Sequence, residues 1–171
     1  KILNFGSGKS GFSYLCNLLG ATVTEVDLKN KEETFFDKEN TFTNDMTVLR
    51  NRKFDLIYSS HSLEHTTKLK KTLEIFSEIS HDNTHFFIEV PEGNHDLKIM
   101  KLRSRPISHI FYFQKNFFEK AFENKVEKDS FFNLFDNENL NKFSERHAAN
   151  NLILWTNRKL NTEFIKDLNY E

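Results

Sequence analysis

Short apolar runs alternate with amphipathic stretches along most of the chain. Apolar runs bounded by glycine, proline or polar residues are typical of buried strands, and apolar positions three and four residues apart are typical of helices. The pattern predicts strands over 1–5, 21–26, 41–43, 54–59, 85–90, 125–134 and 151–155. It predicts helices over 12–19, within the charged stretch 29–40, over 66–80 and over 115–123.

The order of these elements predicts an α/β fold. A strand–helix–strand unit over residues 1–26 needs a right-handed crossover, which makes its two strands parallel. The whole pattern predicts one doubly wound, Rossmann-like domain over residues 1–171, with a mostly parallel sheet and an antiparallel C-terminal strand. We expect an N-terminal helix to be missing from the chain, because Lys1 is not a methionine and already belongs to the first strand. Thr66 or Thr67 is the expected N-cap of the helix over 66–80.

Charge and hydropathy exclude several kinds of partner. The 24 Lys and Arg residues against 25 Asp and Glu residues give a net charge of −1 without a basic tract, so neither nucleic acid nor a membrane surface is expected. No apolar run approaches the roughly 18 residues that span a bilayer. The single Cys16 cannot form an internal disulfide, which predicts a cytoplasmic location. We take the 19 Phe residues for a compositional bias without functional weight.

The segment GSGKSG, residues 6–11, follows the first strand, where the ligand crevice of a doubly wound sheet forms. Glycines there let the backbone approach a ligand, and Asp27 at the end of the second strand can accept hydrogen bonds from two ribose hydroxyls. Loop and acid together predict a nucleoside-containing ligand. The three glycines match the GxGxxG pattern of dinucleotide-binding proteins. A P-loop does not fit, because Leu3 stands where its first glycine is required.

Four segments of the chain occur in the order found in one superfamily. KILNFGSGKSGFSYLCNLLGATVTEVDL resembles the first motif of class I, Rossmann-like S-adenosylmethionine-dependent methyltransferases, and FDLIYSSHSLEHT resembles their fourth-strand motif. HFFIEVPEG is similar to their fifth strand, and SHIFYFQKNFFEKAF is similar to the histidine–aromatic segment and helix of small-molecule- and sugar-directed members. These matches cover most of residues 1–124, and NLILW is similar to a final strand of the methyltransferase sheet.

The resemblance implies an enzyme that binds S-adenosylmethionine. The glycine loop would lie under the methionine moiety, the acid at position 27 would bind the ribose, and the pair at 45 and 46 would lie near the adenine. The residues after the fourth strand would lie beside the methyl group. The cofactor-binding residues so implied are Asn4, Gly6, Ser7, Gly8, Asp27, Leu28, Asp45, Met46, Ser59, Ser60 and His61. The chain departs from the family at Asn4, which stands for an acid, and at Ser10, which stands for a glycine.

Methyl transfer from a sulfonium is an in-line displacement that depends mainly on positioning, with a base to free the acceptor's lone pair. Histidine is the natural base near neutral pH. The resemblance favours His109 as the catalytic base, with His61 as the second candidate. Glu89 and Glu92 are carboxylate alternatives, and His65 is expected to be structural.

Two other functions stay open at this point. The literal GxGxxG favours an NAD(P)-dependent oxidoreductase, although no Tyr is followed four residues later by Lys. The departures at Asn4 and Ser10 favour a degenerate, non-catalytic binding domain. HSLEH matches the H-x-x-E-H pattern of some zinc proteases, but it lies in a turn rather than on a long helix, so we expect no metal site. The expected partner is a small-molecule acceptor, and the oligomeric state is open.

Overall fold

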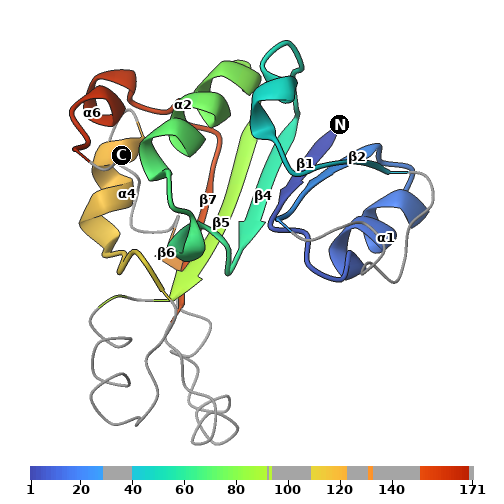
Figure 1. The fold of residues 1–171 in the computed structure, drawn as a ribbon, viewed down its shortest axis with the longest axis horizontal. Coiled ribbons are helices and arrows are strands. Elements are labelled where there is room, and N and C mark those ends of the chain that lie inside the picture. Colours follow the sequence, from blue (N-terminus) through green and yellow to red (C-terminus); the bar gives the residue numbers. More distant parts are fainter. Residues whose placement is uncertain (29–39, 92, 94–108, 123–130, 133–150, 170–171) are drawn as a thin grey trace, which may run out of the picture.

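The computed structural model describes residues 1–28, 40–91, 93, 109–122, 131–132 and 151–169. Within these residues a seven-stranded sheet has the strand order β3-β2-β1-β4-β5-β7-β6 (Figure 1). The strands are β1 (Ile2–Phe5), β2 (Val23–Val26), β3 (Thr41–Thr43), β4 (Leu56–Ser60), β5 (His85–Pro91), β6 (Phe131–Phe132) and β7 (Asn151–Thr156). The first five pair in parallel, whereas β7 pairs antiparallel with both β5 and β6. The predicted mostly parallel sheet with an antiparallel C-terminal strand is confirmed.

Helices cover both faces of the sheet, which makes the fold doubly wound. In Figure 1, α1 (Gly11–Leu18) lies on one face, and α2 (Leu69–Ile79), α4 (Lys115–Ala121) and α6 (Thr162–Lys166) lie on the other. Two short 3₁₀ helices, η2 (Met46–Leu49) and η3 (Leu63–His65), follow β3 and β4. None of the helices in the described ranges is both long and apolar enough to cross a membrane.

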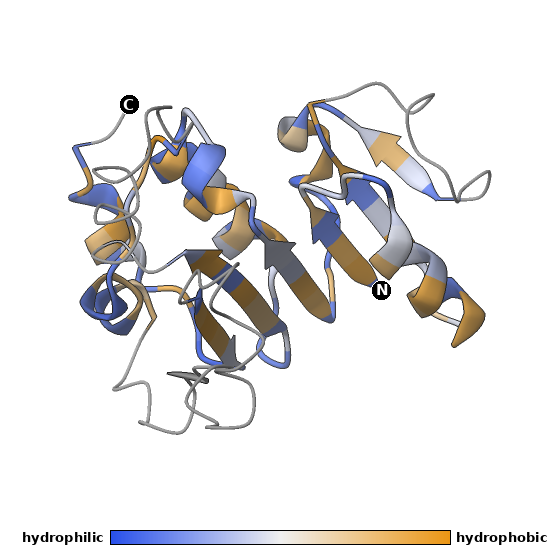
Figure 2. Cartoon of the chain, turned by 90° about the horizontal axis from the view of Figure 1, so that it is seen from below, coloured by the Kyte–Doolittle hydropathy of each residue, from blue (hydrophilic) through white to orange (hydrophobic). Residues whose placement is uncertain are grey.

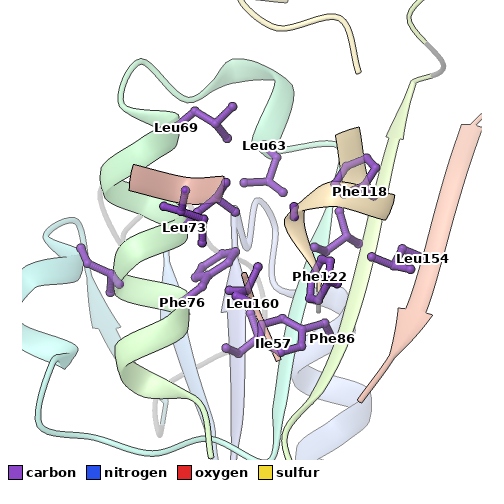
Figure 3. Packing of buried hydrophobic residues seen from close by; sticks show 14 of the residues in the cluster. Ile57, Leu63, Leu69, Leu73, Phe76, Phe86, Phe118, Phe122, Leu154 and Leu160 are labelled. Atoms are coloured by element: carbon purple, nitrogen blue, oxygen red, sulfur yellow. The ribbon is translucent and has the colours of Figure 1, made fainter. Parts of the chain in front are cut away.

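The face under α2 carries the hydrophobic core. Leu69, Leu73 and Phe76 repeat at helical spacing and are at most 1% exposed, as the predicted apolar face requires. Figure 3 shows these side chains packed against Ile57 of β4 and Phe86 of β5, with aromatic residues of the α4 region beside them. Each fully buried side chain of this size contributes about 1.5–3 kcal/mol to folding. Figure 2 shows that the central strands of the sheet are mainly hydrophobic.

The opposite face carries a row of aromatic rings and a polar contact. Phe12 of α1 stacks on Tyr58 of β4 with ring centroids 3.7 Å apart, and Tyr58 stacks on Phe87 of β5 at 5.0 Å. The helix α1 itself contributes Ser13 as its buried residue. The apolar residues of α1 are not all buried, since the Leu15 side chain is 60% exposed. The side of α1 that meets the sheet combines the ring of Phe12 with Ser13, whose hydroxyl accepts a hydrogen bond from Asn4 of β1.

Some predicted element boundaries differ from the structure. The helix over 66–80 begins at Leu69 after Lys68, and no side-chain hydrogen bond caps it. The predicted threonine N-cap is wrong because the Thr66 hydroxyl instead pairs with that of Thr72 at 3.2 Å. The predicted helix within 29–40 and most of the predicted strand over 125–134 lie outside the described residues, apart from the short strand β6.

The register of the sheet brings four chain segments to one edge. Phe5 at the end of β1 pairs with Ser59, Ser60 pairs with Glu89, and Pro91 pairs with Asn151. Because parallel strands end at the same edge, the glycine loop, the segment after β4 and the end of β5 meet there. The candidate site is built on this edge.

Candidate functional site

The glycine loop adopts backbone conformations that suit glycine. Gly6 and Gly8 have φ values of 73° and 53°, and Ser10 has a φ of 62°. Ser10 therefore keeps the left-handed conformation of the glycine that it replaces, at a cost of roughly 1–2 kcal/mol for a non-glycine residue. Its hydroxyl is fully buried and has no hydrogen-bond partner. The loop keeps its shape at this position in spite of the serine.

Gly6 lies against the segment that follows β4. A Cβ atom built on Gly6 would lie 1.8 Å from Ser62 Oγ, which is far inside van der Waals contact. The Ser62 hydroxyl donates to the carbonyl oxygen of Ser60 at 2.9 Å and lies 3.4 Å from that of Gly6. The loop after β1 and the turn after β4 are thus in direct contact, so only glycine fits at position 6.

Asp27 holds the loop from the end of β2. Its Oδ2 atom accepts a hydrogen bond from the backbone N–H of Gly8 at 2.8 Å. The backbone N–H groups of Gly6 and Ser7 donate to the carbonyl oxygen of Val26 at 2.7 and 3.2 Å. The structure therefore brings the predicted loop and acid together. Leu28, the next predicted residue, is 89% exposed.

Asn4 is held within the fold. Its side chain is 2% exposed, and its Nδ2 atom donates to Ser13 Oγ at 2.8 Å. This hydrogen bond joins β1 to α1 beneath the glycine loop. The amide at position 4 therefore orients the helix that follows the loop.

Asp45 and Met46 lie at the start of η2. Asp45 Oδ1 accepts from the backbone N–H of Thr47 at 2.9 Å, and the Thr47 hydroxyl lies 2.8 Å from each carboxylate oxygen. These hydrogen bonds lower the pKa of Asp45. Met46 is partly buried against the core. The carboxylate of Asp45 thus caps its own turn, while the backbone N–H of Asp27 donates to Thr43 at 3.3 Å and joins the two segments.

The residues that end β4 form a network with the end of β5. Ser59 is fully buried, and its hydroxyl has no hydrogen-bond partner. Ser60 Oγ donates to Glu89 Oε2 at 2.5 Å, and Asn151 Nδ2 donates to Glu89 Oε1 at 2.8 Å. His61 has a φ of 49°, a strained conformation that is commoner at functional sites than elsewhere.

His61 lies between two carboxylates. Its Nδ1 atom is 3.5 Å from Glu64 Oε1, and its Nε2 atom is 3.6 Å from Glu89 Oε1. Glu64 first and Glu89 second raise the pKa of His61 to about 10, and His61 lowers the pKa of Glu89 to about 2. His61 therefore carries its proton at neutral pH, so it can donate a hydrogen bond but is a poor resting base.

His109 lies beside His65. The two rings are 4.8 Å apart between centroids, and one ring nitrogen of each lies within 4.8 Å of a Glu64 carboxylate oxygen. Glu92, the other predicted carboxylate, lies outside the described residues. Glu64, Ser62 and Asn151 also lie in this site, although no sequence pattern predicted them as site residues. The glutamate in HSLEH was visible as a signal, whereas Asn151 reaches the site only through the antiparallel register of β7.

A cavity of about 680 Å³ lies at the N-terminal ends of α2 and α4. Its volume is within the range of about 300–1,000 Å³ that is typical of small-molecule sites. None of the predicted cofactor residues lines it. Its lining consists of Thr67, Leu69, Ile110, Phe111, Tyr112, Phe113, Gln114, Asn116, Phe117 and Asn169.

A family model described as a methyltransferase domain matches residues 1–125. No curated protein matches the chain. A SAM dependent methyltransferase from Archaeoglobus fulgidus has a TM-score of 0.54 at 16% identity, over 91% of this chain and 85% of that one. The plantazolicin methyltransferase BpumL, in complex with a triazolic desmethylPZN analog and SAH, has a TM-score of 0.61 at 13% identity, over 90% of this chain and 74% of that one.

A third solved structure is a complex between the Haloferax volcanii Trm112 methyltransferase activator and the putative methyltransferase. It has a TM-score of 0.57 at 14% identity, over 90% of this chain and 80% of that one. The chain spans 39% of the length of a putative methyltransferase from Anabaena variabilis ATCC 29413. At these identities the structural likenesses support the fold.

Proposed function

Because this chain belongs to the family of methyltransferase domains, we propose that it transfers a methyl group from S-adenosylmethionine to a small-molecule acceptor. The observation that carries the proposal is the hydrogen bond between Gly8 and Asp27, which joins the glycine loop after β1 to the acid after β2. The glycine backbone, which a ligand can approach closely, thus lies beside a carboxylate that can bind a ribose diol. This supports the binding of an adenosyl group at the ends of β1 and β2. The SAH in the BpumL complex supports the same class of ligand.

The sheet favours one nucleoside over a dinucleotide. Dinucleotide-binding sheets consist of two parallel βαβαβ halves that bind the ligand across the crevice. Here β1, β2 and β3 form one such half, and β4 and β5 belong to the second, whose last strand is replaced by the antiparallel β7. The second half is therefore incomplete, which favours S-adenosylmethionine, with its single nucleoside, over a dinucleotide.

We propose two roles for the histidines. His61, held between Glu64 and Glu89, fixes the turn that follows β4 and so helps to orient the acceptor. His109 is the proposed proton acceptor, provided that its ring nitrogens bind no metal ion. The acceptor would bind in the cavity lined by residues 110–114, because this segment follows His109 directly. The unpaired Cys16 supports a cytoplasmic location as part of this proposal.

The test is calorimetric titration with S-adenosylmethionine, S-adenosylhomocysteine and NADH. We expect both adenosyl ligands to bind and NADH not to bind. Asp27→Asn keeps an oxygen that accepts from Gly8 N–H but removes the charge, so it weakens adenosyl binding about 10- to 100-fold. Asp82→Asn, in the turn at the opposite edge of the sheet, is the matched control and leaves affinity unchanged. NADH binding alone supports the oxidoreductase, and binding of none supports the degenerate domain.

The acceptor site has its own test. Ile110→Ala enlarges the cavity without touching the glycine loop, so it raises KM for a small-molecule acceptor and leaves the affinity for S-adenosylmethionine unchanged. Acceptors are found by screening hydroxyl- and amine-bearing compounds for a gain of one methyl group by mass spectrometry. An unchanged KM in Ile110→Ala would place the acceptor elsewhere.

A further inference from the structure

Glu64, His65 and His109 come together although the last two are 44 positions apart in the chain. The backbone N–H groups of Ile110 and Phe111 both donate to the carbonyl oxygen of Glu64, at 2.8 and 3.1 Å. This backbone clamp fixes the segment that carries His109 against η3. One carboxylate oxygen of Glu64 and one ring nitrogen each of His65 and His109 all lie within 4.8 Å of one another.

The burial of the Glu64 carboxylate points separately to a bound cation. Its side chain is 1% exposed, and neither of its oxygens has a hydrogen-bond partner. Two histidine nitrogens approach the same oxygen, Oε1, at 3.5 Å from His61 and 3.9 Å from His65. Buried polar groups without hydrogen bonds are rare and costly, and buried charges are paired or coordinate metals. His61 already offsets part of its charge, but neither oxygen is hydrogen-bonded, so the carboxylate can still bind a cation.

We propose that Glu64, His65 and His109 bind one divalent transition-metal ion, for which Zn²⁺ is the best match. Imidazole ligands favour zinc and its neighbours over Mg²⁺ and Ca²⁺, which prefer oxygen. Two histidines and one glutamate leave a fourth position open, as in catalytic rather than structural zinc sites. Ligand atoms in a tetrahedral site lie about 3.3 Å apart. The His65 side chain is 43% exposed, so it has room to close the remaining gap.

This site differs from the one that H-x-x-E-H suggests. In that motif both histidines bind the ion from one helix. Here His61 follows β4 and lies between Glu64 and Glu89, so His109 from a distant segment takes its place. The expectation of no metal site rested on the missing helix, and the backbone clamp removes that objection.

The proposal does not depend on methyl transfer. An imidazole that binds the ion has no lone pair for a proton, so a loaded site excludes His109 as the base. The open position would then hold a water molecule or an acceptor oxygen, whose pKa the ion lowers. Metal binding and S-adenosylmethionine binding are measured separately, so either can fail alone.

The experiment is a titration of the purified, chelator-treated full chain with Zn²⁺ in competition with a chromophoric chelator. We expect one equivalent to bind, and Co²⁺ to give visible absorption typical of four or five ligands. Glu64→Gln, His65→Ala and His109→Ala each weaken binding at least about tenfold. His81→Ala is the matched control, because the His81 side chain is 34% exposed and lies in the turn before β5.

Binding of less than one equivalent, or equal affinity in the three variants and His81→Ala, overturns the proposal. If His109→Ala does not fold by circular dichroism, Glu64→Gln decides, because it keeps the backbone carbonyl that holds Ile110 and Phe111. Unchanged Zn²⁺ affinity in a folded Glu64→Gln protein contradicts the site.

Discussion

Replacing Gly6 by alanine tests whether the glycine loop is shaped by the segment after β4. The added Cβ would lie 1.8 Å from Ser62 Oγ and 2.3 Å from Ser62 Cβ, so the two segments must separate. The backbone φ of 73° adds strain for any residue with a Cβ. Gly8 has a φ of 53° but nothing within 4 Å of a built Cβ, so Gly8→Ala carries the strain alone.

The magnitudes follow from these two contributions. A left-handed conformation costs a non-glycine residue roughly 1–2 kcal/mol, and overpacking costs typically about 1–3 kcal/mol more. We therefore expect Gly6→Ala to lower the free energy of unfolding by about 2–5 kcal/mol and Gly8→Ala by about 1–2 kcal/mol. Gly11→Ala, at the first position of α1 with open space around it and no positive φ, is the neutral control.

The assay is urea unfolding followed by far-UV circular dichroism. Ser62→Gly removes both atoms that collide with the new Cβ, so the double variant recovers the steric part of the loss in a double-mutant cycle. Ser62→Ala keeps the Cβ and recovers less. Equal destabilisation by Gly6→Ala and Gly8→Ala, or no coupling between positions 6 and 62, would refute the packing of the loop against the β4 turn.

Three further predictions concern other parts of the structure. Ser10→Gly relieves a φ of 62° and removes a buried hydroxyl without a partner, so urea unfolding should show about 1–2 kcal/mol of added stability; a loss of stability would contradict the strain. Because the pKa of Glu89 falls from 4.5 to about 2 on folding, its contribution to stability is full above pH 4.5 and is lost as the pH drops toward 2. Glu89→Gln should flatten that part of the stability–pH curve, and an unaltered slope would show that Glu89 is not paired with His61. Phe76→Ala, at the centre of the α2 core, should cost about 3–5 kcal/mol in thermal or urea unfolding, whereas a cost below about 1 kcal/mol would contradict its full burial.

Elements buried on the sheet could be predicted well from the sequence. The apolar runs of β4 and β5 have one fully buried face, and α2 has the 3.6-residue spacing of a helix that covers a sheet, so their patterns reflect strong, local constraints. The predicted helix α1 was found, but its orientation was not predicted. The hydrogen bond between Asn4 and Ser13 and the stacking of Phe12 on Tyr58 hold one side of α1 on the sheet, and hydropathy alone does not record them.

Site contacts between consecutive elements were predicted from the sequence, whereas site contacts between distant segments were not. The loop and Asp27 lie on consecutive elements of one strand–helix–strand unit, so spacing alone brings them together. Asn151 meets Glu89 because of the register between β7 and β5, and His109 meets Glu64 because of two backbone hydrogen bonds. Neither contact has a periodic signal, since both join segments far apart in the chain.

The aromatic row on the face that carries α1 also makes the folding of this chain observable. Trp155, the only tryptophan, lies on β7 with its ring 6.2 Å from that of Phe87. Its emission changes when β7 pairs with β5, which requires contact between distant segments and is slow relative to helix formation. Stopped-flow fluorescence therefore times the closing of the antiparallel edge, while circular dichroism also follows the parallel strands and α2. A lag between the two signals would show that the half of the sheet with the glycine loop forms first.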